Sequence, residues 1–281
     1  MKSFLTLLLL VASVFAANTK IVSREYKLML DPSLFSGNHP ENAVSQYWNN
    51  LETLIHNNLN RASFGSLLLQ NDRTVAIYDT AGSCLLYRNH LIFRERVENS
   101  HREVTLKYRS ADRYIAGHQD MSGSKSDAKT KFEEDISAPF FSKFSHSTTQ
   151  SISNSKNLNK LDDPIRLYPD LEKYDFNDSI PIVKVSGLTV HEKVYRGSFV
   201  DLGNKDAEFS LTLWYTDTSS TDPVLAEISF KYKDKDEHYT EKVTTRAKKL
   251  FEAMQSMTNY NSQTSLTKTA YIYKYNESFC Y

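Results

Sequence analysis

The chain has 281 residues, of which 40% are hydrophobic and 24% charged, and it contains only 8 glycines and 7 prolines. This composition excludes a collagen-like, low-complexity or wholly disordered protein. Its 34 lysines and arginines balance 34 aspartates and glutamates. The zero net charge argues against a protein that coats nucleic acid, because such binding draws most of its affinity from excess positive charge. Any anion-binding site must therefore come from local clustering of charge.

The first residues have the pattern of a secretory signal peptide. Lys2 precedes an apolar run from Phe4 to Phe15, which ends in the possible cleavage sequence Val14-Phe15-Ala16. The run is too short for a membrane-spanning helix, which needs about 20 apolar residues. No later segment is apolar enough to span a bilayer. We therefore expect residues 1–16 to be removed and the mature protein to be secreted or periplasmic.

Two cysteines remain in the mature chain, Cys84 and Cys280. An oxidising compartment permits a disulfide between them, but two unpaired thiols fit the sequence equally well. Two cysteines are too few for a zinc site built from thiolates.

The first part of the chain contains a predicted strand, a predicted helix and then several further strands. Residues 21–30 place apolar and polar side chains on opposite faces with a period of two, which predicts a strand. Residues 41–62 have apolar residues at the three-four spacing of one buried helical stripe. Further strands are predicted at residues 74–80, 90–98, 102–109 and 129–136.

The composition shifts between residues 142 and 160 to Ser, Asn, Thr and Lys, which predicts a mobile polar loop or insertion. Strand patterns resume at 180–185, 192–200, 208–215 and 224–233. A second helix is predicted from about residue 240 to 257, and a last strand at 269–275. Many short strands without regular strand–helix alternation predict a mainly β (α+β) single domain over residues 20–281. We expect an antiparallel sheet or barrel with helices packed outside it.

The polar faces of the predicted strands carry charged side chains in a repeating pattern. Arg94 and Arg96 share one face, Lys107 lies between apolar neighbours, and one strand carries Lys129, Lys131, Glu133 and Asp135 on the same face. One interpretation is a half-buried sheet whose polar face lies in water. The other is a closed barrel whose polar faces point inward, where a polyphosphate would satisfy the cations. Interior carboxylates could then hold a divalent cation.

Several of these strands carry motifs in a recognisable order. Val75-Ala76-Ile77-Tyr78-Asp79-Thr80 is similar to a strand that ends in Y-x-D-T, and Leu91-Ile92-Phe93-Arg94-Glu95-Arg96 is similar to a following strand with L-R-x-R. Val104-Thr105-Leu106-Lys107 is similar to a next L-T-L-K strand. Ser23-x-Glu25-x-Lys27 and Glu227-Ile228-Ser229-Phe230 stand where an N-terminal E-x-E-x-K motif and a late E-x-E strand belong. In this order the motifs resemble the CYTH, or triphosphate tunnel metalloenzyme, superfamily.

The resemblance implies an antiparallel β-tunnel of about eight strands. The tunnel would bind a small triphosphate- or polyphosphate-bearing ligand with Mg²⁺ or Mn²⁺. It implies phosphate contacts from Lys27, Arg94, Arg96 and Lys107, with Lys131, Lys184 and Arg196 as further candidates. Glu25 and Lys27 are the implied catalytic residues, and Glu25 and Glu227 are implied metal ligands.

Two expected carboxylates are missing, because Ser23 and Ser229 stand at positions where the family has glutamate. Lys231 follows two residues after Ser229. Glu133 and Asp135 could substitute as metal ligands if their strand closes on the tunnel; otherwise they are surface acids.

Three functions are compatible with these patterns. The first is a secreted, metal-dependent hydrolase of a triphosphate or polyphosphate. The second is a non-catalytic binder of phosphorylated ligands, and the third is a secreted structural or interaction protein on the same scaffold. The sequence contains no G-x-G-x-x-G, P-loop, G-x-S-x-G or H-E-x-x-H motif that would favour another chemistry. It leaves the oligomeric state open.

Overall fold

A computed structural model describes residues 20–264 and 266–281 of the chain, and the predicted signal peptide at residues 1–16 lies outside the described residues. Within them, ten strands form one sheet. The strands are β1 (Ser23–Leu30), β2 (Ser63–Asp79), β3 (Leu91–Glu98), β4 (His101–Ser110), β5 (Lys129–Ser137), β6 (Phe141–Ser151), β7 (Val183–Lys184), β8 (Val190–Asp201), β9 (Asp206–Tyr215) and β10 (Leu225–Lys233).

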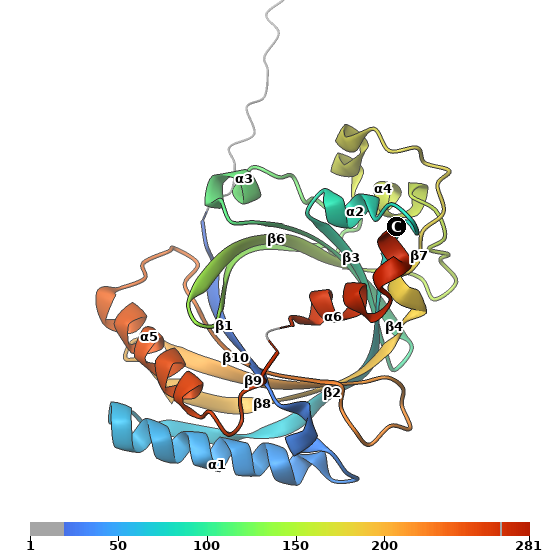
Figure 1. Cartoon of the computed structure of the whole chain (residues 1–281). Coiled ribbons are helices and arrows are strands. Elements are labelled where there is room, and N and C mark those ends of the chain that lie inside the picture. The colour runs from blue at the N-terminus through green and yellow to red at the C-terminus, as the bar shows by residue number, and fades with distance from the viewer. Residues whose placement is uncertain (1–19, 265) are drawn as a thin grey trace, which may run out of the picture.

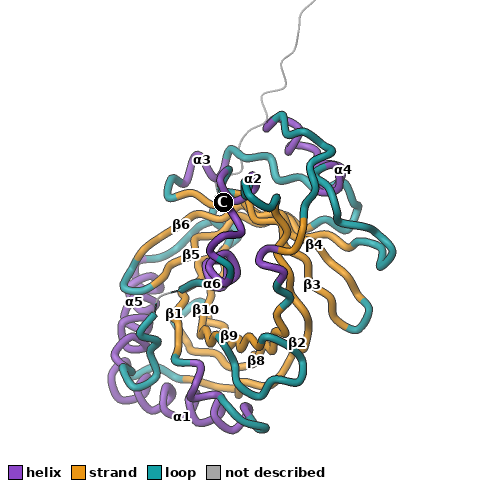
Figure 2. The backbone as a smooth tube through the Cα atoms, turned by 45° about the vertical axis from the view of Figure 1, so that its right-hand side comes forward, coloured by secondary structure: helices purple, strands orange, loops and turns teal. Residues whose placement is uncertain are grey.

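The sheet closes into a ring (Figure 2). Its order is β3-β4-β6-β5-β1-β10-β9-β8-β2, and β2 pairs with β3 to complete the circle, while the short β7 pairs with β2 beside the ring. This confirms the predicted tunnel-like β fold, with two differences in detail. The ring has nine strands instead of eight, and β1 pairs with β5 in parallel. A closed ring with an odd number of strands cannot alternate in direction throughout, so at least one pair must be parallel.

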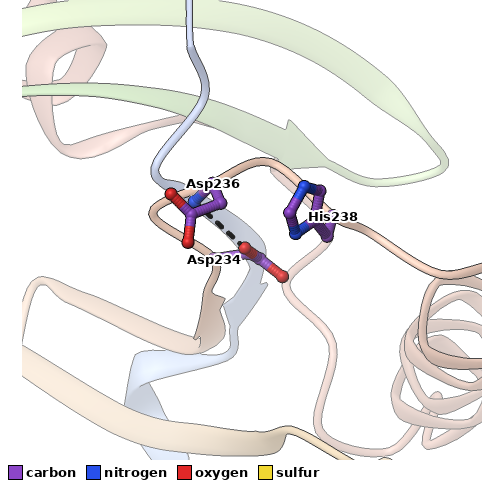
Figure 3. A group of neighbouring side chains, drawn as sticks. All are labelled: Asp234, Asp236 and His238. Carbon is purple, nitrogen blue, oxygen red and sulfur yellow. Dashed lines mark hydrogen bonds between the residues drawn. The ribbon is translucent and has the colours of Figure 1, made fainter.

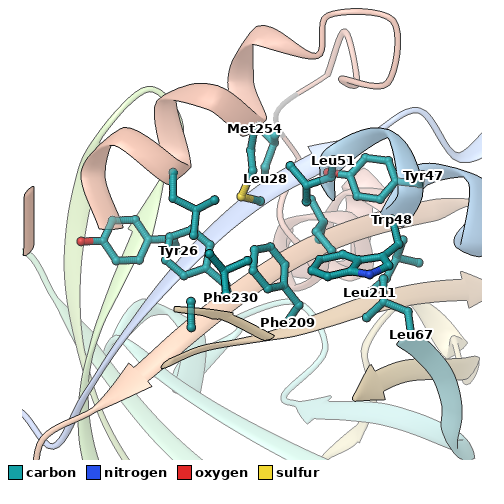
Figure 4. Close-up of a cluster of buried hydrophobic side chains, with 14 of the residues drawn as sticks. Tyr26, Leu28, Tyr47, Trp48, Leu51, Leu67, Phe209, Leu211, Phe230 and Met254 are labelled. Carbon is teal, nitrogen blue, oxygen red and sulfur yellow. The ribbon is translucent and has the colours of Figure 1, made fainter. Parts of the chain in front are cut away.

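Two long helices, α1 (Pro40–Leu59) and α5 (Glu241–Ser256), pack on the outside of the ring (Figure 1). They match the predicted helices at 41–62 and 240–257 within a few residues. Outward-facing aromatic side chains of the strands meet them, as Figure 4 shows for Trp48 of α1 beside Phe209 and for Tyr26 stacked on Phe230. Each such buried side chain contributes roughly 1.5–3 kcal/mol. The apolar core therefore lies outside the ring, between strands and helices.

Shorter elements complete the chain. The remaining α-helices are α2 (Leu85–Arg88), α3 (Arg113–Gly117), α4 (Asp162–Leu167) and α6 (Lys268–Tyr275). The 3-10 helices are η1 (Pro32–Phe35), η2 (Pro169–Tyr174), η3 (Val185–Gly187) and η4 (Glu277–Cys280). No helix in the described part of the chain is both long and apolar enough to cross a membrane.

The predicted polar loop at 142–160 is wrong in its first half, because residues 141–151 form β6 between β4 and β5. The inward-facing Ser145, Ser147 and Thr149 are polar because the interior of the ring is polar. The outward-facing His146 and Thr148 are also buried and polar. A strand with polar residues on both faces has no hydropathy alternation, which explains the wrong prediction.

Three other predicted elements differ from the structure. The segment predicted as a strand at 269–275 is α6, in which Tyr271 and Tyr275 lie one helical turn apart with ring centroids at 6.0 Å. Of the predicted strand at 180–185, only the two residues of β7 join the sheet, and Pro181 forms an isolated bridge with Lys160. The strand predicted at 74–80 is the end of the much longer β2.

The two cysteines form a disulfide, Cys84–Cys280, which resolves the alternatives left open by the sequence. It links η4 at the end of the chain to the residue before α2. A second link lies nearby, because the buried Tyr273 hydroxyl of α6 donates to Asp79 Oδ2 at 2.8 Å. The C-terminal segment is thus attached to the ring, and α6 lies over the ring opening in both Figure 1 and Figure 2.

Candidate functional site: a basic tunnel

The inward faces of the ring strands line a cavity of about 230 Å³. This is somewhat below the roughly 300 Å³ at which pockets for drug-sized ligands begin, so the cavity suits a small ligand. Four of the lining residues are glutamates and ten are lysines or arginines: Lys27, Arg73, Arg94, Arg96, Lys107, Arg109, Lys131, Arg196, Lys231 and Lys268. Confined cations repel one another, so the cavity electrostatically favours an anion.

The predicted phosphate ligands occupy this cavity with one exception. Lys27, Arg94, Arg96, Lys107, Lys131 and Arg196 all line it, because they share the inward parity of their strands. Lys184 does not line it. It lies on β7 beside the ring, and its Nζ donates to Thr189 Oγ1 at 2.9 Å.

One part of the cavity is an arginine cluster around Glu192 of β8. Arg73 and Arg96 contact Glu192 Oε1 at 2.7 and 3.6 Å, and Trp214 Nε1 donates to its other oxygen at 2.7 Å. Arg94 Nη2 lies 3.4 Å from Thr105 Oγ1. The single carboxylate of Glu192 thus serves as counter-charge to more than one guanidinium group.

This cluster has more positive charge than its surroundings balance. Burial and the neighbouring Arg96 lower the pKa of Arg94 to about 9, and burial also lowers the pKa of Arg96. Burial would raise the pKa of Glu192, but Arg96, Lys268 and Arg73 outweigh it and hold that pKa well below its usual range. Among the described residues, the buried Nε atoms of Arg94, Arg96 and Arg196 have no hydrogen-bond partner. Buried donors of this kind are costly unless a ligand accepts from them.

A second part of the cavity is a lysine cluster on the neighbouring strands β1, β5, β6 and β4. Lys27 Nζ lies between Glu25 Oε2 at 3.0 Å and Asp135 Oδ1 at 2.7 Å. Asp135 Oδ2 accepts from Ser145 Oγ at 2.6 Å and faces Arg109 at 3.5 Å and Lys107 at 4.0 Å.

Burial and neighbouring charges shift the pKa values of this cluster in opposite directions. Burial would lower the pKa of Lys27, but Asp135 and Glu25 outweigh it and raise that pKa well above its usual range. Burial would raise the pKa of Glu25, but Lys27 and Lys131 together outweigh it and lower that pKa to about 2. Lys107 is less well balanced, because burial lowers its pKa to about 7 and Asp135 only partly opposes this.

The four predicted metal ligands each have a lysine partner. Lys27 holds Glu25 and Asp135, Lys131 Nζ lies 2.5 Å from Glu133 Oε2, and Lys268 Nζ lies 2.8 Å from Glu227 Oε1. Ser23 Oγ also donates to Glu133 Oε1 at 2.7 Å. In this arrangement the carboxylates act as partners of ammonium groups, and their donor set does not fit Mg²⁺ or Mn²⁺, which needs several oxygens directed at one point.

Elsewhere in the described residues, one group brings three potential ligand atoms within 4.8 Å of one another: Asp234, Asp236 and His238, in the loop after β10 (Figure 3). Asp234 is paired with Lys205 at 3.2 Å, and the other two residues are exposed. None of the three lines the tunnel cavity. The four predicted tunnel ligands do not form such a cluster.

Some lining residues were not predicted. Arg109 continues the alternation of Thr105 and Lys107, so the period of two could have identified it. Arg73 lies in the part of β2 that the sequence pattern missed. Lys268 reaches the cavity from the first turn of α6, and no pattern within its own segment signals this position.

A second cavity of about 370 Å³ adjoins the tunnel. The two share Lys27, Arg109, Glu227, Lys268 and Thr269. The tunnel thus has additional space beside its lysine cluster.

No family model matches the sequence, and no curated protein matches it. Among solved structures, the chain is similar to the adenylyl cyclase candidate HpAC1 from Hippeastrum, described as having a dominant triphosphatase activity (13% identity, TM-score 0.44, covering 90% of this chain and 96% of that chain). It is also similar to an adenylate cyclase candidate from Bacillus halodurans (10% identity, TM-score 0.41, covering 89% and 96%). A third similar structure is the PH1819 protein from Pyrococcus horikoshii (13% identity, TM-score 0.30, covering 81% and 90%). These TM-scores are below 0.5, so the similarities carry no functional argument.

Proposed function

We propose that this protein is an exported binder of small phosphorylated anions, which holds a triphosphate or polyphosphate group inside the tunnel. The observation that carries the proposal is the arginine cluster. Arg94, Arg96 and Arg196 line a cavity with an excess of cations, and their buried Nε atoms have no hydrogen-bond partner among the described residues.

Phosphate is the anion that best matches this chemistry. The planar guanidinium group donates two parallel hydrogen bonds to phosphate oxygens. Each hydrogen bond to a charged group contributes roughly 1.5–3 kcal/mol net. Several such bonds together can offset the estimated cost of about 4–15 kcal/mol for immobilising a ligand. The motif resemblance to triphosphate tunnel proteins supports the same ligand class.

Export is part of the proposal because of the pattern of residues 1–16. The disulfide Cys84–Cys280 supports it, since structural disulfides persist in oxidising compartments. An exported binder would meet phosphorylated molecules outside the cytoplasm.

Hydrolysis of the bound triphosphate is a second candidate function. It is favoured by the position of Glu25, Glu133 and Glu227, which line the same cavity as the cations. A metal-dependent reaction would require these carboxylates to leave their lysine partners. Binding is therefore the function that the resting arrangement supports better.

The proposal is tested by calorimetric titration of the purified mature protein with inorganic tripolyphosphate. Replacing Arg94 and Arg96 together with alanine should weaken binding by at least about 100-fold, since loss of two charge-assisted contacts costs about 3 kcal/mol or more. Arg166→Ala is the matched control, because Arg166 is an exposed arginine of α4 that pairs with Asp162 and does not line the tunnel cavity. Wild-type protein that does not bind tripolyphosphate would disprove the proposal.

The same samples can be assayed for phosphate release with Mg²⁺ or Mn²⁺. Turnover that is lost in Glu25→Gln would establish the hydrolase function. Tight binding without turnover would establish the binder.

A further inference from the structure

Glu25, Glu133, Asp135 and Glu227 each have a lysine partner. These lysines suggest how the cavity balances the charge of a bound phosphate. Lys27, Lys131 and Lys268 come from three different elements, β1, β5 and α6. Each holds its carboxylate at 3.0 Å or less. Each of the three ammonium groups is therefore already paired with a carboxylate at the same cavity before any ligand arrives.

The strand register places lysines as well as a carboxylate around Glu25, and the lysines would repel a divalent cation. Glu25 lies opposite Asp135 on β5 but opposite Lys231 on β10, and Lys27 lies opposite Ser229. Lys231 Nζ lies 3.5 Å from Glu208 Oε2, so it too is held in place by a carboxylate. A cation placed between Glu25 and Asp135 would have to displace Lys27 from both, and the displaced ammonium group would then repel it.

We propose that the tunnel binds its phosphorylated ligand without a divalent cation, because the ammonium groups of Lys27, Lys131 and Lys268 supply the positive charge that a metal ion would otherwise provide. This inference rests on the proposed function, namely that the tunnel holds phosphate. In this arrangement the carboxylates position the lysines. Each lysine has three N–H donors, so a lysine that contacts one or two carboxylates retains a donor for a phosphate oxygen.

The test is titration of the mature protein with inorganic tripolyphosphate in EDTA and, separately, in excess Mn²⁺ or Mg²⁺. We expect the affinity in EDTA to equal or exceed the affinity with metal, because free cations also bind the ligand in solution and compete for it. In EDTA, Lys27→Gln should weaken binding at least tenfold. Glu25→Gln should strengthen binding, because it removes a negative charge from the cavity while Asp135 still holds Lys27. Lys184→Gln, which changes a lysine beside the ring, is the matched control and should bind like the wild type.

Lys27→Gln leaves Glu25 and Asp135 without their common partner and could impair folding. Lys268→Gln provides the second variant, because Lys268 lies in the first turn of the C-terminal α6 and, within the described residues, Glu227 is the one carboxylate it contacts. It should also weaken binding in EDTA, by about five- to tenfold, with an unchanged circular dichroism spectrum.

Direct titration with Mn²⁺ in the absence of phosphate completes the experiment. Wild type and Glu25→Gln should give the same Mn²⁺ isotherm, because no Mn²⁺ binds at Glu25. Tripolyphosphate binding that EDTA abolishes, that Mn²⁺ restores and that depends on Glu25 would overturn the inference but leave the proposed function intact. Absence of tripolyphosphate binding under all conditions would instead disprove the proposed function.

Discussion

Individual side chains divide the tunnel into two regions that balance charge differently. In the arginine cluster, Glu192 faces Arg73 and Arg96, and Glu103 lies 3.9 Å from Arg96. Buried Nε atoms of this region have no hydrogen-bond partner in the described part of the chain. In the lysine cluster, Asp135 and Glu25 compensate Lys27 closely. A phosphate chain should therefore gain most of its binding energy from the arginine region and be oriented by the lysines.

Lys107 should make anion binding dependent on pH near neutrality. Burial lowers the pKa of Lys107 to about 7, and Asp135 of β5 opposes this only in part. The positive charges of Arg109, Lys27 and Lys131 lower the pKa further. A phosphate nearby favours the ammonium form, so binding takes up a proton and weakens as the pH rises through about 7. Calorimetry with tripolyphosphate between about pH 6 and pH 8 measures this slope.

The phosphate groups themselves also titrate near pH 6. The quantity to compare is therefore the change of affinity with pH in the wild type and in Lys107→Gln. Lys107→Gln should bind more weakly at low pH and show a smaller change with pH. Identical pH slopes for wild type and variant would show that Lys107 does not titrate on binding.

At the scale of whole elements, the sequence predicts those strands that have one polar and one apolar face. The strand with Arg94 and Arg96 and the strand with Lys107 are examples, and the parity of their charges also places these residues in one cavity. Strand β6 was missed because it faces the polar tunnel on one side and a buried polar surface on the other. Helix α6 was mistaken for a strand because its alternating tyrosines imitate a period of two. Lys268 could therefore not be assigned, since its position depends on how α6 packs against the ring.

Strand β6 should be essential for closure of the ring, since it joins β4 to β5. Ser147→Pro removes a backbone N–H in the middle of a strand paired on both sides and should destabilise the protein by about 1–3 kcal/mol. Urea unfolding followed by fluorescence measures this change. Ser147→Ala is the control for loss of the hydroxyl.

A second proline variant tests whether the loop after β6 tolerates proline better than the strand does. Asn154 occupies the second position of a turn closed by Lys156 N–H donating to Ser153 O at 3.0 Å, and proline is favoured at that position. Asn154→Pro should therefore change stability by less than about 1 kcal/mol. Equal destabilisation by both prolines would contradict the distinction between β6 and the loop.

On the scale of the whole molecule, the C-terminal segment both stabilises the ring and contributes side chains to the tunnel cavity. The segment begins at Lys268 and Thr269, which line the tunnel, and ends at the disulfide with Cys84. Between them, Ile272 and Tyr273 are buried, and Tyr273 binds Asp79 of β2. The charge that Lys268 contributes to the cavity therefore depends on attachment of the chain end.

Removing the disulfide should reduce stability and weaken ligand binding together. The bond joins residues 196 positions apart, and the chain-entropy model assigns a loop of this length about 5 kcal/mol as an upper value. Replacing Cys84 and Cys280 with serine should lower the free energy of urea unfolding by about 2–5 kcal/mol. It should also lower tripolyphosphate affinity as far as Lys268→Gln does, if the released segment withdraws Lys268 from Glu227. Wild-type protein in a reducing agent should behave like the double variant, which controls for the serine side chains. If stability falls but affinity does not, the contacts of Tyr273 and Ile272 alone hold α6 over the tunnel, and the disulfide serves only the fold.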